Sequence, residues 1–133
     1  MTQITTMKMA HSQDPAQLIR SEVGNIEGID VYHNLILIGV YTRPEKTAGG
    51  IILSERTKKE DVHQGVVGLV LKVGPMAFVD DGATKFHGQS LNVGDWCVFR
   101  PGDTHKVAIN GVVCRLVEDS LIKLRVPHPD VVY

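Results

Sequence analysis

The sequence has little of what marks several large classes of protein. It holds two cysteines, Cys97 and Cys114, in 133 residues, too few for a disulfide framework, so both are expected to be buried free thiols in strands. No apolar run approaches the roughly 20 residues that a membrane-spanning helix needs. Basic and acidic residues nearly cancel, with a formal net charge of −1, so no charge excess favours nucleic acid or an anionic membrane surface. These absences predict a globular chain with neither nucleic acid nor membrane as a partner.

Patterns typical of catalysis and metal binding are also missing. The six histidines are scattered, without an H-x-x-x-H pair or a His–carboxylate cluster at ligand spacing. Their convergence in three dimensions stays open, but an ordinary surface role is expected for His11, His33, His63, His87, His105 and His128. We therefore predict a binding or assembly protein with no catalytic residue, no metal and no cofactor.

The length and the start of the chain suggest its organisation and location. A chain of 133 residues is long enough to bury a core and is expected to form one domain. The first residues lack the charged-then-apolar order of a secretory signal, so a cytoplasmic location is expected. We divide the chain into an N-terminal extension over 1–28, a β domain over 29–126 and an extended tail over 127–133.

A short helix is predicted within the N-terminal extension. Asp14 can cap it, and Pro15 suits its first position because the N–H that proline lacks would be unpaired there. Leu18, Ile19 and Val23 follow at helical spacing. Such a helix is too short to be stable alone, so if it is ordered it must dock on another surface.

Residues 29–126 show the pattern of an all-β domain. Turn signals separate five segments rich in β-branched and aliphatic residues, "IDVYHNLILIGV", "GVVGLVLKVG", "WCVF", "HKVAI" and "VVCRLV". Asn110-Gly111, between the last two, is the clearest hairpin signal because both residues tolerate a positive φ. The flanks of "DDG" over 80–82 indicate another hairpin tip. Short strands at this spacing predict a small barrel or sandwich.

One apolar segment has two interpretations. The stretch "TAGGIIL" over 47–53 places Ile51, Ile52 and Leu53 between a glycine pair and the polar run "SERTKKEDVHQG". These side chains can form a core strand after a turn or an exposed anchor for another protein, and the local pattern does not separate the two. The flanks favour the anchor, because they hold too little apolar area to offset the entropy cost of becoming ordered.

Taken in order, the motifs resemble those of the GroES-type co-chaperonin family. The strand "NLILIGV" comes first, "TAGGIIL" follows in a long loop, and "LNVGDWCVF" and "LVEDSLIKLRV" come last. The most specific pieces are "AGGIIL" and "VGDWCVF", and the resemblance covers about three quarters of the chain. It implies a small GroES-like β-barrel that assembles as a ring, generally a heptamer, and caps a large chaperonin that hydrolyses ATP.

The resemblance also assigns roles to particular segments. It implies a mobile loop over 42–64 and a roof-like hairpin over 76–90. The residues concerned are Gly49 and Gly50 as the loop hinge, Gly50, Ile51, Ile52 and Leu53 as the chaperonin-binding residues, and Asp80, Asp81 and Gly82 as the roof hairpin tip. The first and last strands of neighbouring subunits are expected to pair edge to edge through 29–40 and 121–126.

The chain departs from the family pattern at both ends. About thirty residues precede Leu35, the tail "PHPDVVY" is extra, and the first strand lacks the usual proline and charge pattern. Such divergence resembles co-chaperonins carried by bacterial viruses. The alternative to a co-chaperonin is therefore a virion structural protein of a bacteriophage, a head or tail component built on a GroES-like fold.

Overall fold

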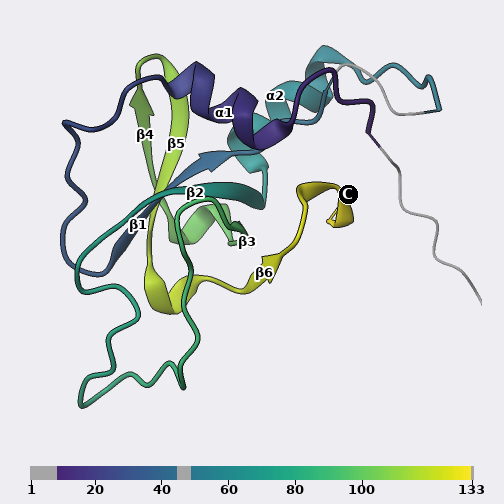
Figure 1. The fold of residues 1–133 in the computed structure, drawn as a ribbon. Coiled ribbons are helices and arrows are strands. Elements are labelled where there is room, and N and C mark those ends of the chain that lie inside the picture. The colour runs from purple at the N-terminus through teal and green to yellow at the C-terminus, as the bar shows by residue number, and fades with distance from the viewer. Residues whose placement is uncertain (1–8, 45–48, 133) are drawn as a thin grey trace, which may run out of the picture.

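The computed structural model describes residues 9–44 and 49–132, and within them the chain forms one antiparallel sheet with two α-helices (Figure 1). The strands are β1 Leu35–Val40, β2 Val67–Val73, β3 Trp96–Val98, β4 His105–Ile109, β5 Val112–Glu118 and β6 Leu124–Val126. The helices are α1 Pro15–Val23 and α2 Glu55–Gln64, with short 3-10 turns at Pro101–Asp103, Asp119–Leu121 and Pro129–Val131.

The sheet confirms the mostly β fold and each of the five predicted strand segments. Its six strands lie in the order β4-β5-β1-β2-β3-β6. Each neighbouring pair is antiparallel, and a register shift interrupts the β1–β2 ladder between Leu37 and Ile38. No β4–β6 pairing occurs within the described residues, so closure of the sheet into the expected barrel is not shown.

β1 lies inside the sheet, which corrects one expectation. The whole segment 29–40 was expected to form a free edge, but β1 pairs with β5 on one side and β2 on the other. Residues 29–34 precede the strand and lie outside the sheet. The edges of the sheet are β4 and β6. The C-terminal strand therefore lies at an edge, as expected, and residues 29–34 are the part of the N-terminal segment that is not paired within the sheet.

The core occupies both faces of β1, which explains why its sequence is apolar without alternation. Leu37 packs in one cluster with residues of β2, α1 and β5. Ile36 and Ile38 pack in a second cluster on the opposite face, with Val70 and Phe99 among others. A strand buried on both faces cannot alternate polar and apolar side chains.

α1 covers the first of these faces, as Figure 1 shows. It has the predicted start at Pro15, and Ile19 and Val23 are buried in the core. A side chain at Gly39 of β1 would collide with Ile19, so the glycine lets the helix approach closely. The predicted helix therefore docks on the sheet of its own chain.

The β4–β5 connection is the predicted Asn110–Gly111 hairpin. Both residues have positive φ, 51° and 81°, as a two-residue turn of the favoured twist requires. The Asn110 side-chain amide also donates to the carbonyl of Val23. The turn thus holds the C-terminal end of α1 as well as closing the hairpin.

Two polar segments differ from expectation. The segment 54–64 was expected to lack order, but Glu55–Gln64 forms α2, with the Ser54 hydroxyl accepting from the Thr57 N–H at its start. The serine cap and the ion pair between Arg56 and Glu60, four residues apart on one helix face, stabilise a helix that has no apolar stripe. The tail was expected to be extended, but Pro129–Val131 forms a 3-10 turn with Pro129 buried.

Candidate functional site

The connection from β1 to β2 is the segment that the motifs single out, and it extends away from the sheet in Figure 1. It holds the anchor segment, Ile51–Leu53, followed by α2. Thr47 and Ala48 of "TAGGIIL", together with residues 45 and 46, lie outside the described residues. The structure therefore describes residues 49–53 of the motif.

The anchor segment exposes its aliphatic side chains. Ile51 is 61% and Ile52 80% exposed, and Leu53 is half-buried. Neither isoleucine belongs to a core cluster, although the backbone of Ile52 forms an isolated β-bridge. Gly49 and Gly50 are exposed as well, and Gly50 has a φ of 88°, a conformation that glycine adopts without strain.

A buried ion pair closes the base of this connection. The Arg43 guanidinium donates to both carboxylate oxygens of Asp61 at 2.8 to 3.2 Å, and the Arg43 backbone N–H donates to the same group at 2.8 Å. Asp61 is 2% exposed. Because Arg43 follows β1 and Asp61 lies in α2, this Arg43–Asp61 pair ties the two ends of the 44–60 excursion together.

The C-terminal end of α2 has its own attachment to the sheet. Arg115 of β5 donates to the His63 carbonyl at 2.8 Å, so it satisfies a carbonyl of the last helical turn. The helix is therefore held from β1 and from β5. The anchor segment precedes α2, and the side chains of Ile51 and Ile52 are largely exposed there.

The predicted roof segment, 76–90, doubles back on itself and protrudes from the body (Figure 1). It contains turns but no strand, so it follows the course of a hairpin without a ladder. At its tip, Asp81 accepts from the N–H groups of Ala83 and Thr84, and Asp80 accepts from that of Phe86. The Thr84 and Ala83 hydrogen bonds lower the pKa of Asp81. Asp80, Asp81 and Gly82 are all exposed.

Asp119 organises the base of the roof segment, and sequence reasoning missed it. Its carboxylate accepts from the Phe78 N–H at 2.9 Å, the Asn34 amide at 3.0 Å and the Ser120 N–H at 2.7 Å. Phe78 in turn packs edge to face against Phe86, with centroids 5.5 Å apart. The only local signal was the polar "EDS" after β5, which does not reveal partners so far away in the chain.

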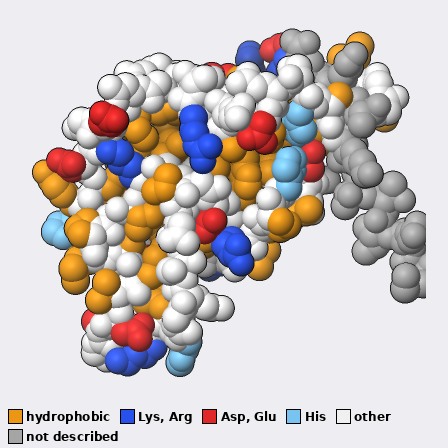
Figure 2. Space-filling model, viewed as in Figure 1, with side chains coloured by type: hydrophobic (Ala, Val, Ile, Leu, Met, Phe, Trp, Pro, Cys, Tyr) orange, Lys and Arg blue, Asp and Glu red, His pale blue; other side chains and the backbone are white. Residues whose placement is uncertain are grey.

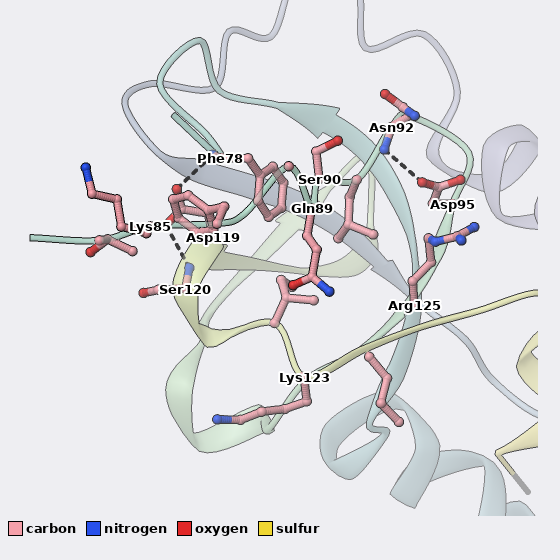
Figure 3. Close-up of a pocket in the computed structure, with 16 residues that line it drawn as sticks. Phe78, Lys85, Gln89, Ser90, Asn92, Asp95, Asp119, Ser120, Lys123 and Arg125 are labelled. Atoms are coloured by element: carbon pink, nitrogen blue, oxygen red, sulfur yellow. Dashed lines mark hydrogen bonds between the residues drawn. The ribbon is translucent and has the colours of Figure 1, made fainter. Parts of the chain in front are cut away.

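A cavity of about 790 Å³ lies between the roof segment and the β6 region. Figure 3 shows Phe78 and Gln89 on one wall and Lys123 and Arg125 on the other. It faces β6, the sheet edge with an exposed Leu124. The cavity brings together charged and apolar groups, among them Lys123, Arg125 and Phe78.

The two cysteines are buried free thiols in β3 and β5, as predicted. Burial, helped by the charge of Asp95, raises the pKa of Cys97 to about 12. Burial raises the pKa of Cys114 to about 11. Both groups stay protonated at neutral pH and are poor nucleophiles.

The two terminal segments meet in a polar cluster that was not foreseen. His11, His128 and Asp130 offer ligand atoms that all lie within 4.8 Å of one another. The Tyr41 hydroxyl joins them by donating to Asp130 at 2.8 Å. His11 and Asp130 are 119 positions apart, so no spacing rule could have paired them.

Comparison with known proteins identifies the family. No described helix is both long enough and apolar enough to cross a membrane. No curated protein matches the sequence. A family model described as Chaperonin 10 Kd subunit matches residues 29–124, a range that holds the whole sheet except the end of β6. The chain therefore belongs to the Chaperonin 10 Kd subunit family, and its role is that of a co-chaperonin and not of an enzyme.

Proposed function

We propose that this chain assembles into a ring, generally seven-membered in its family, and caps the folding chamber of a large chaperonin in the cytoplasm. Contact is made through Gly50, Ile51, Ile52 and Leu53, and ATP hydrolysis belongs to the partner. The observation that carries this proposal is the exposure of Ile51 and Ile52 in a connection whose base is closed by Arg43 and Asp61.

The energetics fit a weak contact repeated around a ring. Full burial of each aliphatic side chain is worth about 1.5–3 kcal/mol, so the anchor segment can contribute several kcal/mol before ordering costs. Because α2 is already folded, those costs fall mainly on the residues ahead of it. A single contact stays weak, and several contacts on one ring add up to tight but reversible binding.

Ring assembly has a matching surface at β6. Among the described strands it pairs with β3 alone, and its Leu124 is exposed. Residues 29–34, in the connection from α1 to β1, lie outside the sheet and expose Tyr32. Figure 2 shows hydrophobic side chains at the surface on the side of the molecule where this connection runs. We propose that 29–34 of one subunit pairs with β6 of the next, which would satisfy both sets of backbone groups.

The decisive variant is Ile52→Asp, which places a charge where an apolar groove must close. It should abolish capture by an ATP-loaded chaperonin in a pull-down, while melting temperature and ring mass stay unchanged because the side chain is 80% exposed. Leu18→Asp on the outer face of α1, another exposed aliphatic position, is the matched control and should bind normally.

Two outcomes would contradict the proposal. If Ile52→Asp unfolds the subunit, the segment is a core strand. If the variant forms a stable ring that binds chaperonin as the unaltered protein does, the anchor assignment is wrong and the alternative of a virion structural protein is favoured. That alternative has its own check, because a structural component is a stoichiometric band in purified particles and a co-chaperonin is absent from them.

A further inference from the structure

We propose that His11, His128 and Asp130 form a binding site for one divalent transition-metal ion of the zinc type. The ion would link the N-terminal extension to the C-terminal segment. All three residues lie outside the part of the chain that matches the family, so the site is a feature of this chain's added ends. It does not depend on chaperonin binding.

The spacing of the donor atoms fits a small tetrahedral ion. Zinc binds nitrogen and oxygen at about 2.0–2.2 Å, which puts neighbouring ligands of a tetrahedron about 3.3 Å apart. His11 Nε2 lies 2.9 Å from Asp130 Oδ2, and His128 Nδ1 lies 3.7 Å from the same oxygen. These distances bracket the required one, and the ligand atoms of all three residues lie within 4.8 Å of one another, so small shifts of the side chains would complete the geometry.

His128 already has the protonation pattern that a ligand needs. The backbone N–H of Asp130 donates to His128 Nδ1 at 3.1 Å, and an N–H can only donate, so Nδ1 carries a lone pair. A metal ion would take over that lone pair. The Asp130 N–H would then turn to water, which is accessible because Asp130 is only partly buried.

The carboxylate is held in position by a rigid neighbour. Tyr41 donates its hydroxyl to Asp130 Oδ1 at 2.8 Å, leaving Oδ2 toward the two imidazoles. Tyr41 is 1% exposed and packs edge to face on Trp96, with centroids 5.8 Å apart. Such support orients a ligand before the ion arrives, and its loss typically costs 10- to 100-fold in affinity.

The donor set indicates which ion would bind. Two imidazole nitrogens and one carboxylate oxygen suit zinc, cobalt or nickel, whereas magnesium and calcium prefer oxygen ligands only. Three protein ligands leave a fourth position for water. Histidine and acidic side chains lie together at the surface on the side where the C-terminus ends (Figures 1 and 2), so the ion has an open path of entry.

A simple hydrogen-bonded contact between the ends is the competing explanation. His11 and Asp130 satisfy each other without an ion, at 2.9 and 3.1 Å. His128 separates the two explanations, because its ring contributes a third donor atom at the same point. Its own contacts include a local hydrogen bond from the Asp130 N–H and an edge-to-face contact with His11. Removing that ring should matter much more for zinc affinity than for the fold.

The test is calorimetric titration of the metal-stripped full chain with zinc chloride. We expect one ion per chain, and affinity at least about 10-fold weaker in His11→Ala, His128→Ala and Tyr41→Phe. His105→Ala, which removes an exposed histidine of β4, is the control and should leave affinity unchanged. At the same zinc concentration, zinc should raise the melting temperature of the unaltered protein more than that of His128→Ala.

Absence of zinc binding by the unaltered chain would overturn the site. So would equal affinity in His128→Ala and the unaltered chain, since the cluster would then be a hydrogen-bonded contact only. Both histidines are partly exposed, and circular dichroism before metal addition checks that each variant is folded. If either variant fails to fold, the other and Tyr41→Phe still decide the question.

Discussion

Two short apolar segments of the same residue types have opposite fates in this molecule. Ile36, Leu37 and Ile38 in β1 are buried, and Ile51 and Ile52 in the anchor segment are exposed. β1 is flanked by β5 and β2 and covered by side chains on both faces. The anchor segment has α2 after it and, within the described residues, an isolated β-bridge at Ile52 in place of a strand ladder. Apolar composition alone therefore does not decide burial; the neighbouring elements that cover a segment do.

The largest difference in unfolding free energy should come from placing a carboxylate in one segment or in the other. Ile38→Asp buries an unpaired carboxylate in the centre of the sheet and should cost at least about 4 kcal/mol of unfolding free energy. Ile52→Asp should change that free energy by less than about 0.5 kcal/mol. Urea unfolding of both variants measures the difference, and similar losses in the two would erase the contrast.

A smaller effect is expected from opening the base of the connection. Asp61→Ala leaves the Arg43 guanidinium without its buried partner, and breaking a buried pair costs about 3–5 kcal/mol. Because the Arg43 side chain is 20% exposed, we expect about 2–4 kcal/mol. Glu60→Ala breaks the exposed Arg56–Glu60 pair and should cost about 0.5 kcal/mol or less. Equal costs in thermal unfolding would show that the Arg43–Asp61 pair contributes nothing special.

The cover over β1 can be tested through α1. Ile19→Ala removes a buried side chain that packs against Gly39 and should cost about 2 kcal/mol. Leu18→Ala, one position earlier on the exposed side of the helix, should be close to neutral. If Ile19→Ala is also neutral in denaturant unfolding, then α1 is not part of the core and the extension acts only on a partner.

The smallest change compares thiols in the two environments. Ile52→Cys should be alkylated rapidly at pH 8, because its thiol is exposed and has an ordinary pKa. Cys97 and Cys114 should react slowly, since burial raises the pKa of Cys97 to about 12 and that of Cys114 to about 11. Mass spectrometry over time measures this. Fast modification of Cys97 in the folded chain would contradict its burial.

The buried thiols also make the stability of the fold depend on pH. A folded-state pKa raised from 9.0 to about 12 for Cys97 means that the unfolded chain loses its proton first as pH rises. The contribution to stability is complete below pH 9 and falls between pH 9 and 12. A melting temperature that stays level over that window would contradict it.

Several local features could be predicted from the sequence because they depend on residues close together in the chain. The Asn110–Gly111 turn follows from the tolerance of both residues for positive φ. The start of α1 follows from Pro15, and the strands follow from runs of β-branched residues. α2 was missed because the prediction relied on apolar periodicity, although Ser54 and the Arg56–Glu60 spacing were available as signals.

By itself, the sequence determined the strand segments, the hairpin turn, the buried thiols and the motifs that indicate the family. Only the tertiary structure decided that β1 lies in the centre of the sheet, that Arg43 meets Asp61, and that His11 meets Asp130. The last two pairs are separated by 18 and 119 positions. Local sequence sets backbone preference and which face of an element is apolar, whereas side chains far apart in the chain meet only through the order in which strands and ends pack.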